Sequence, residues 1–171
     1  MPLTKLNATL GLTGTLPAVS GANLTGISAG KVLQVVSTQL VAEFGSSSSS
    51  FVDVTGMALT ITPSATSSKI LLLMNTNLYQ NTGTSYVILR YERAISGGAT
   101  TNIGHGTYGL TFARSEGAHN FWAGTGMTYL DSPSTTSATT YQVQVSNGGS
   151  GSVSVGVNSS NTNSIYALEI E

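Results

Sequence analysis

Residues 128–145, TYLDSPSTTSATTYQVQV, decide the fold because they predict two strands joined by a polar loop. Tyr141, Val143 and Val145 alternate with polar residues, and a period of two is typical of a half-buried strand. Pro133 cannot donate a hydrogen bond to a sheet, and the hydroxyls around it can bond their own backbone, which favours a turn. The stretch is therefore predicted to be either a hairpin or a crossing from one sheet to another.

Similar short segments follow one another over residues 31–171, separated by turns rich in Gly, Asn and Ser. None of them has a convincing helical period, and the alternation of apolar and polar residues favours strands. We therefore predict an all-β chain folded as an antiparallel β-sandwich, which is jelly-roll-like if it forms two Greek keys of four strands. The expected strands are 32–38, 43–50, 51–61, 69–79, 86–93, 107–112, 118–131, 140–146, 153–157 and 164–171.

Three of these segments carry more specific predictions. The apolar run at 70–74 is uninterrupted, which predicts burial on both faces. The serine run at 46–50 is expected to be a flexible loop. In the last segment Glu169 is expected to face solvent, and the inward-facing residues are then Tyr166, Leu168 and Ile170.

The charge content limits the function classes. Only 8% of the residues are charged, with six Lys or Arg, seven Asp or Glu and a net charge of −1, whereas an ordinary domain carries roughly 25%. Six scattered cations do not form the basic stripe that binding to phosphates requires, so we expect no nucleic-acid partner. The absence of cysteine excludes disulfides and thiolate metal sites. No apolar run is long enough for membrane insertion, and no secretory leader is expected.

Residues 1–30 differ from the rest of the chain. Their leucines are frequent but are interrupted by Gly and Pro, so no helical period survives and extended chain with turns is favoured. We predict an N-terminal assembly or attachment arm at 1–30, followed by a β-sandwich knob at 31–171. The alternative is an arm folded back onto its own domain. The leucines expected to make the contacts are Leu3, Leu6, Leu10, Leu12, Leu16 and Leu24.

Three segments of the sequence resemble a known group of proteins. The segments at 129–145, YLDSPSTTSATTYQVQV, and at 51–73, FVDVTGMALTITPSATSSKILLL, resemble a β-domain of tailed-phage tail-fibre and virion appendage proteins. The segment at 14–27, GTLPAVSGANLTGI, is similar to the connector ahead of distal domains in tail fibres. The resemblance implies a bacteriophage structural protein that is located on the virion after assembly in the host cytoplasm. Together with scarce charge at the sheet edges, it favours a homotrimer.

Sequence patterns typical of catalytic or metal sites are weak. The hexapeptide at 104–109 fits GxGxxG, but an alternating segment follows it rather than the helix that a phosphate site needs. His105 and His119 with Glu116 are too few ligands for a zinc site, although a trimer axis would present one histidine three times. No nucleophile elbow or recognisable pair of glycosidase carboxylates is present. We therefore expect no enzymatic activity, no cofactor and no metal.

The best candidates for a contact site are the aromatic and basic residues between 94 and 126. Exposed rings stack on sugar faces, and loops on a rigid scaffold often carry recognition. The alternative is that Phe121 and Trp122 belong to the core or to a subunit interface. The candidate receptor contacts are His105, Tyr108, Arg114, His119 and Trp122.

Two functions fit this sequence. A tail-fibre knob would use the contact site for host attachment, by binding a surface glycan. A capsid decoration protein, either a head fibre or a cement protein, would instead use the arm to seat on the shell and would contact other virion proteins.

Overall fold

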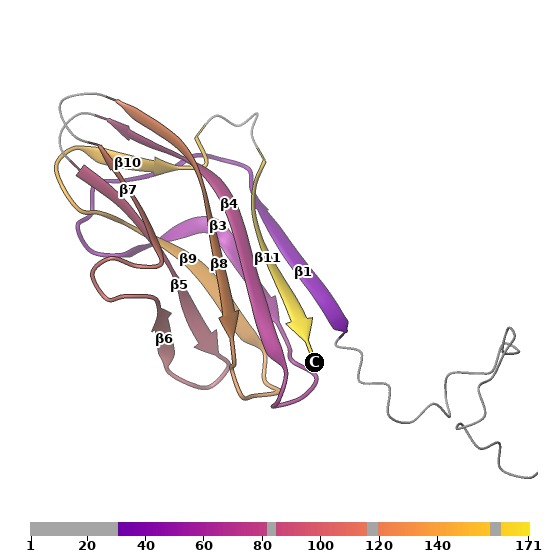
Figure 1. Cartoon of the computed structure of the whole chain (residues 1–171). Helices are drawn as coiled ribbons and strands as arrows, with labels where there is room; N and C mark the ends of the chain where they lie inside the picture. The colour runs from indigo at the N-terminus through magenta and orange to yellow at the C-terminus, as the bar shows by residue number, and fades with distance from the viewer. Residues whose placement is uncertain (1–30, 82–84, 116–119, 158–161) are drawn as a thin grey trace, which may run out of the picture.

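The computed structural model describes residues 31–81, 85–115, 120–157 and 162–171, which form eleven strands (Figure 1). Gly, Ser and Asn punctuate the chain often, so the strands are separated by short turns. The strands are β1 (Val32–Leu40), β2 (Phe44–Ser46), β3 (Val52–Ile61), β4 (Lys69–Asn81), β5 (Ser85–Ile95), β6 (Thr100–Ile103), β7 (Thr111–Ser115), β8 (Phe121–Asp131), β9 (Thr139–Asn147), β10 (Ser152–Val155) and β11 (Asn163–Ile170).

The strands form two antiparallel sheets that pack as a sandwich. Sheet A runs β1-β11-β4 with β8 on the other side of β4, and the short β10 and β2 extend it. Sheet B runs β3-β9-β5, and β5 also pairs with β6 and β7. The eight principal strands therefore wind as β1-β11-β4-β8 over β3-β9-β5-β7, which is the double Greek key of a jelly roll. The predicted fold class is confirmed.

The stretch at 128–145 is a crossing between the sheets. β8 ends at Asp131 in sheet A, and β9 begins at Thr139 in sheet B. Arg93 of β5 donates hydrogen bonds to both carboxylate oxygens of Asp131, at 2.8 and 2.9 Å, and the Tyr141 hydroxyl donates to Oδ2 at 2.6 Å. The crossing is thus held by a charged network that joins one sheet to the other.

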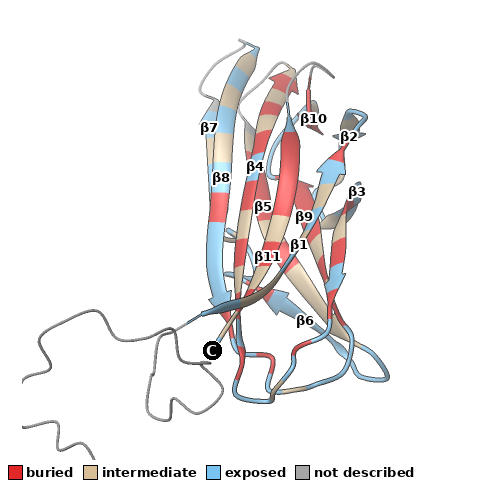
Figure 2. Ribbon diagram, turned by 90° about the vertical axis from the view of Figure 1, so that its right-hand side faces the viewer, coloured by how far each residue is buried: buried red, intermediate tan, exposed pale blue. Residues whose placement is uncertain are grey.

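Alternation places one face of each sheet in the core. In β4 the side chains of Ile70, Leu72 and Met74 are buried between the sheets, whereas Leu71 and Leu73 point to the outer face and are half-buried. The prediction that the run at 70–74 is buried on both faces is therefore wrong. No described element covers the outer face of sheet A, and Figure 2 shows β8 and β1 exposed along much of their length.

β11 faces the opposite way from the prediction. Ile165, Ala167 and Glu169 point to the core, and the apolar residues between them lie half-buried on the outer face. Glu169 is only 1% exposed. Its Oε1 accepts hydrogen bonds from the amide and hydroxyl of Ser64, at 2.7 and 2.6 Å, and its Oε2 accepts one from Gln34 Nε2 at 2.6 Å. These donors replace the water that the carboxylate loses, so a charged residue can occupy an inward position.

The two ends of the knob meet at one pole. The Glu171 amide donates to the carbonyl oxygen of Lys31 at 3.3 Å, and the chain enters and leaves there (Figure 1). The predicted arm, with its leucines from Leu3 to Leu24, lies outside the described residues. Among the described residues no helix is long and apolar enough to cross a membrane.

Candidate functional site

The aromatic residues that could contact a ligand gather on the outer face of sheet B. In β5, Val87 and Leu89 point to the core, so the residues that alternate with them, Tyr86 and Ile88, point outward. β7 pairs with β5 so that Phe112 lies opposite Ile88 and Arg114 opposite Tyr86. Paired residues of an antiparallel sheet share a face, and the register therefore brings these side chains together.

The loop between β6 and β7 adds Tyr108 to this surface. His105 and Gly109 close the loop by reciprocal backbone hydrogen bonds of 2.9 and 2.8 Å. The His105 ring stacks on Tyr108 with centroids 5.3 Å apart, and its Nδ1 accepts from the amides of Thr107 and Tyr108 at 3.1 Å each. The GxGxxG hexapeptide is thus a tight loop between strands. The strand expected at 107–112 begins only at Thr111, because the loop occupies its first half.

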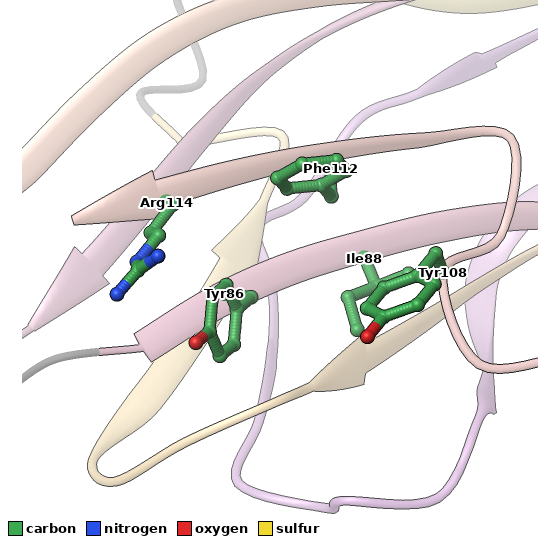
Figure 3. A pocket seen from close by; sticks show the side chains of 5 residues that line it. All are labelled: Tyr86, Ile88, Tyr108, Phe112 and Arg114. Carbon is green, nitrogen blue, oxygen red and sulfur yellow. The ribbon is translucent and has the colours of Figure 1, made fainter.

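These residues line a hollow of about 210 Å³ between Tyr86, Ile88, Tyr108, Phe112 and Arg114, and Figure 3 shows how their side chains lie. The Arg114 guanidinium carbon lies 5.1 Å from the centroid of the Tyr86 ring. The Tyr108 and Phe112 rings are 6.4 Å apart, and their exposed fractions are 61% and 56%. Large aromatic surfaces are therefore presented to solvent on a strand framework.

A second hollow of about 500 Å³ adjoins the first and shares Ile88 with it. The Arg90 guanidinium carbon lies 3.8 Å from the centroid of the Phe51 ring, and Arg90 Nε donates to Gln144 Oε1 at 2.8 Å. Burial lowers the pKa of Arg90 below its ordinary value, against the opposing effect of the Glu92 charge. We call the two hollows together the sheet-B groove. Its second part is lined by Ser49, Ser50, Phe51, Ile88, Arg90, Gly106, Thr107, Ser146 and Gly148.

The serine run forms a wall of this groove; after Ser46 it is a loop, as predicted, and hydrogen bonds attach it to β9. The Ser146 hydroxyl donates to the carbonyl oxygen of Ser49 at 2.9 Å, and the Asn147 amide donates to that of Ser48 at 2.8 Å. The Ser48 hydroxyl also donates to the carbonyl oxygen of Ser50 at 2.8 Å and accepts from the amide of Ser50 at 3.1 Å. The end of β9 therefore fixes the run in place.

The groove combines ring faces, hydroxyl groups and guanidinium groups, and no carboxylate is among its described lining residues. Aromatic faces bind the apolar faces of sugars, while hydroxyl and guanidinium groups bond sugar oxygens. Within the described parts of the chain, no group of three or more His, Cys, Asp or Glu could hold a metal ion. The arrangement is suited to recognition of a neutral or acidic polyhydroxylated ligand.

The structure brings together three of the five candidate contacts. Tyr108 and Arg114 line the groove, and His105 supports Tyr108. Trp122 instead lies on the outer face of sheet A, 60% exposed, with its ring 4.6 Å from that of Tyr79. His119 lies outside the described residues.

Five large side chains of the groove were not among the predicted contacts. These are Tyr86, Ile88, Phe112, Phe51 and Arg90. The alternation over residues 86–89 already places Tyr86 and Ile88 on one face. Their meeting with residues from β7 and the 104–109 loop depends on register, which the local pattern does not determine.

Comparison with known proteins gives limited similarity. No family model matches the chain, and no curated protein does. Among solved structures, the chain is similar to one of infectious bursal disease virus, Gx strain, with 14% identity and a TM-score of 0.36 over 94% of this chain and 42% of that one. It is also similar to the T13 particle of that virus, with 11% identity and a TM-score of 0.36. Its similarity to the VP2 subviral particle has 13% identity and a TM-score of 0.33. The chain spans 42%, 37% and 38% of the length of these three chains.

Proposed function

We propose that this chain is a structural protein of a tailed-phage virion, a tail-fibre or appendage knob that attaches to host surface glycan through the sheet-B groove. The sequence segments that resemble tail-fibre domains support a role in the virion. The observation that carries the attachment role is the groove itself, where Tyr86, Tyr108 and Phe112 lie beside Arg114 on the exposed face of a rigid sheet. Binding at one groove would be weak, and several copies on one particle would multiply it.

The proposal includes a homotrimer and no catalytic step. Near-neutral charge gives little repulsion between copies, and a trimer would present three grooves to one glycan surface. The ligand would be held by ring stacking and by hydrogen bonds, which require no acid, base or nucleophile.

Titration of the intact protein with monovalent host oligosaccharides tests the attachment role. Replacing Tyr108 with Ala removes a stacking face and should weaken per-site affinity on the order of ten-fold, since ten-fold corresponds to about 1.4 kcal/mol. Trp122→Ala is the matched control, because Trp122 is equally exposed but lies on the other sheet. Equal effects of the two substitutions, or no binding by the wild type, would count against glycan recognition in this groove.

A capsid decoration protein is the second candidate. Both ends of the knob lie at one pole, so residues 1–30 leave from that pole and could seat it on a shell. The copy number in purified particles, measured by quantitative mass spectrometry, separates the candidates. A few dozen copies at the tail support an appendage, while hundreds over the shell support decoration.

A further inference from the structure

The outer face of sheet A carries a continuous apolar row across four strands. Val35 of β1 pairs with Leu168 of β11, Leu168 pairs with Leu71 of β4, and Leu71 pairs with Leu130 of β8. Because paired residues share a face, all four side chains point outward together. Val35 is 59% exposed and Leu130 48%, so this row faces solvent among the described residues.

Neighbouring rows enlarge the apolar surface toward one end of the sheet. In the outward-facing row nearer the start of β1, Val32 pairs with Ile170. In the outward-facing row on the opposite side of the first row, Tyr166 pairs with Leu73. The following row, with Gln39, Ser164 and Asn75, is polar. Contiguous apolar surfaces of this kind mark contact sites. We call the surface the sheet-A patch; it comprises Val32, Val35, Leu71, Leu73, Leu130, Tyr166, Leu168 and Ile170.

The patch lies where the first thirty residues join the knob. Lys31 directly precedes Val32, which is itself part of the patch. Leu24 stands seven residues before Lys31, and seven residues can span about 23 Å at roughly 3.3 Å each. Four strands spaced about 4.8 Å apart make the row only about 15 Å wide. The leucines nearest the knob, Leu16 and Leu24, can therefore reach every residue of the row.

We propose that residues 14–27 of the same chain lie across the sheet-A patch, with Leu16 and Leu24 packed on the row formed by Val35, Leu168, Leu71 and Leu130. The tether favours this occupant over another copy, because a short linker gives an effective concentration in the millimolar range. None of the patch residues is charged, and segment 14–27 has no charged residue; Lys69, which pairs with Ile170, borders the patch and is exposed. Contact over the row therefore removes mainly apolar surface from water. Residues 1–13 then leave from sheet A, while the sheet-B groove stays open on the opposite side.

The cysteine-free chain allows a direct test by disulfide trapping. In the full chain, Leu24→Cys is combined with Val35→Cys on the patch or with Thr101→Cys, an exposed position on β6 of sheet B. Under mild oxidation at ~10 µM protein, the first pair should close within one chain on the order of 100-fold faster than disulfides form between chains. The product has the mass of one chain less two hydrogens. The second pair should close far more slowly.

Two outcomes of the trapping experiment overturn the proposal. Disulfides that form between chains at Val35 would show that another copy covers the patch. Equal rates at Val35 and Thr101 would show that the segment does not dock at all.

A dye that fluoresces on apolar surfaces gives an independent measurement. Replacing Leu16 and Leu24 with Ser should raise dye binding several-fold by uncovering the patch, and adding Leu130→Ser should reverse much of the rise. Unchanged dye binding in the first variant would also overturn the proposal.

Discussion

Asp131 is the residue at which the two sheets are tied together. Arg93 and Tyr141 of sheet B both bond its carboxylate, and burial and this bond raise the pKa of Tyr141. Asp131→Asn removes the charge that Arg93 needs, and hydrogen bonds to charged groups contribute about 1.5–3 kcal/mol each. We expect this substitution to lower the free energy of unfolding by about 3 kcal/mol, measured by urea denaturation.

Tyr141→Phe is the control for this network, because it deletes one hydrogen bond and leaves the ion pair. Its expected cost is about 1.5 kcal/mol, the low end of the range for one hydrogen bond to a charged group. If Asp131→Asn cost no more than Tyr141→Phe, the ion pair would contribute little to the joining of the sheets.

Glu169 makes stability depend on pH. Burial alone would raise the pKa of this carboxyl, but hydrogen bonds from Ser64 and Gln34 outweigh burial and lower its pKa to about 2, from an ordinary 4.5. Because the folded pKa is depressed, its contribution is complete above pH 4.5 and is lost as the pH falls toward 2. Wild-type unfolding free energy should therefore decline between these values.

Replacing Glu169 with Gln tests this assignment. The variant should be less stable at pH 7 by about 1.5–3 kcal/mol and should lose part of the acid-dependent decline, as measured by denaturant unfolding at pH 7, 4.5 and 3. An unchanged pH dependence would mean that other carboxyl groups account for the decline.

The loop between β6 and β7 is the element that shapes the groove. Gly109 has a φ of 58°, and a Cβ atom there would collide with the carbonyl oxygen of Leu89. Gly109→Ala should destabilise the knob by about 1–3 kcal/mol and displace Tyr108, which weakens glycan binding. Gly106→Ala in the same loop is the matched control for stability, because a Cβ at Gly106 meets nothing within 4 Å. Thermal unfolding of both variants and oligosaccharide titration of Gly109→Ala against the wild type would test this. Equal stability of the two variants, or unchanged binding by Gly109→Ala, would contradict the role of Gly109.

The elements could be predicted from the sequence where one face is polar and the other apolar. β9 is such a case, because Tyr141, Val143 and Val145 belong to the hydrophobic core, as their alternation predicts. From Ile165 to Ile170, β11 is apolar on both faces except at Glu169, and placing that charge in solvent predicts the opposite orientation of the strand. Its partners Ser64 and Gln34 lie 105 and 135 residues away in sequence, so no local pattern could reveal that the carboxylate is satisfied.

The candidate site could be predicted only in part, because its residues are brought together by strand order and not by local sequence. The abundance of aromatic and basic residues after residue 94 points to Tyr108 and Arg114, and the structure places both in the sheet-B groove. Whether an aromatic residue belongs to one sheet or the other depends on the order of strands, which places β7 beside β5 and β8 beside β4. The sequence therefore predicts Trp122 to lie with Tyr108 and Arg114, whereas Trp122 lies on sheet A and these two residues lie at sheet B.

At the level of the whole molecule, sheet A ends in two edges that carry little charge. Among the described strands, β1 pairs only with β11 and β8 only with β4, and their only charged residue is Asp131, which is buried. Unguarded edges favour pairing with other chains. We expect sedimentation equilibrium of the full chain to give the mass of three copies. A single-chain mass across the micromolar range would contradict the proposed trimer.

Trp122 is the only tryptophan of the chain, and it lies on sheet A, away from the sheet-B groove. The intrinsic fluorescence of the protein is therefore an optical probe of one side of the molecule. A sugar bound in the groove should leave the emission and its quenching by acrylamide unchanged. Any partner that settles on β8 should shield the indole. Attachment and assembly can thus be followed separately in one cuvette, without a label.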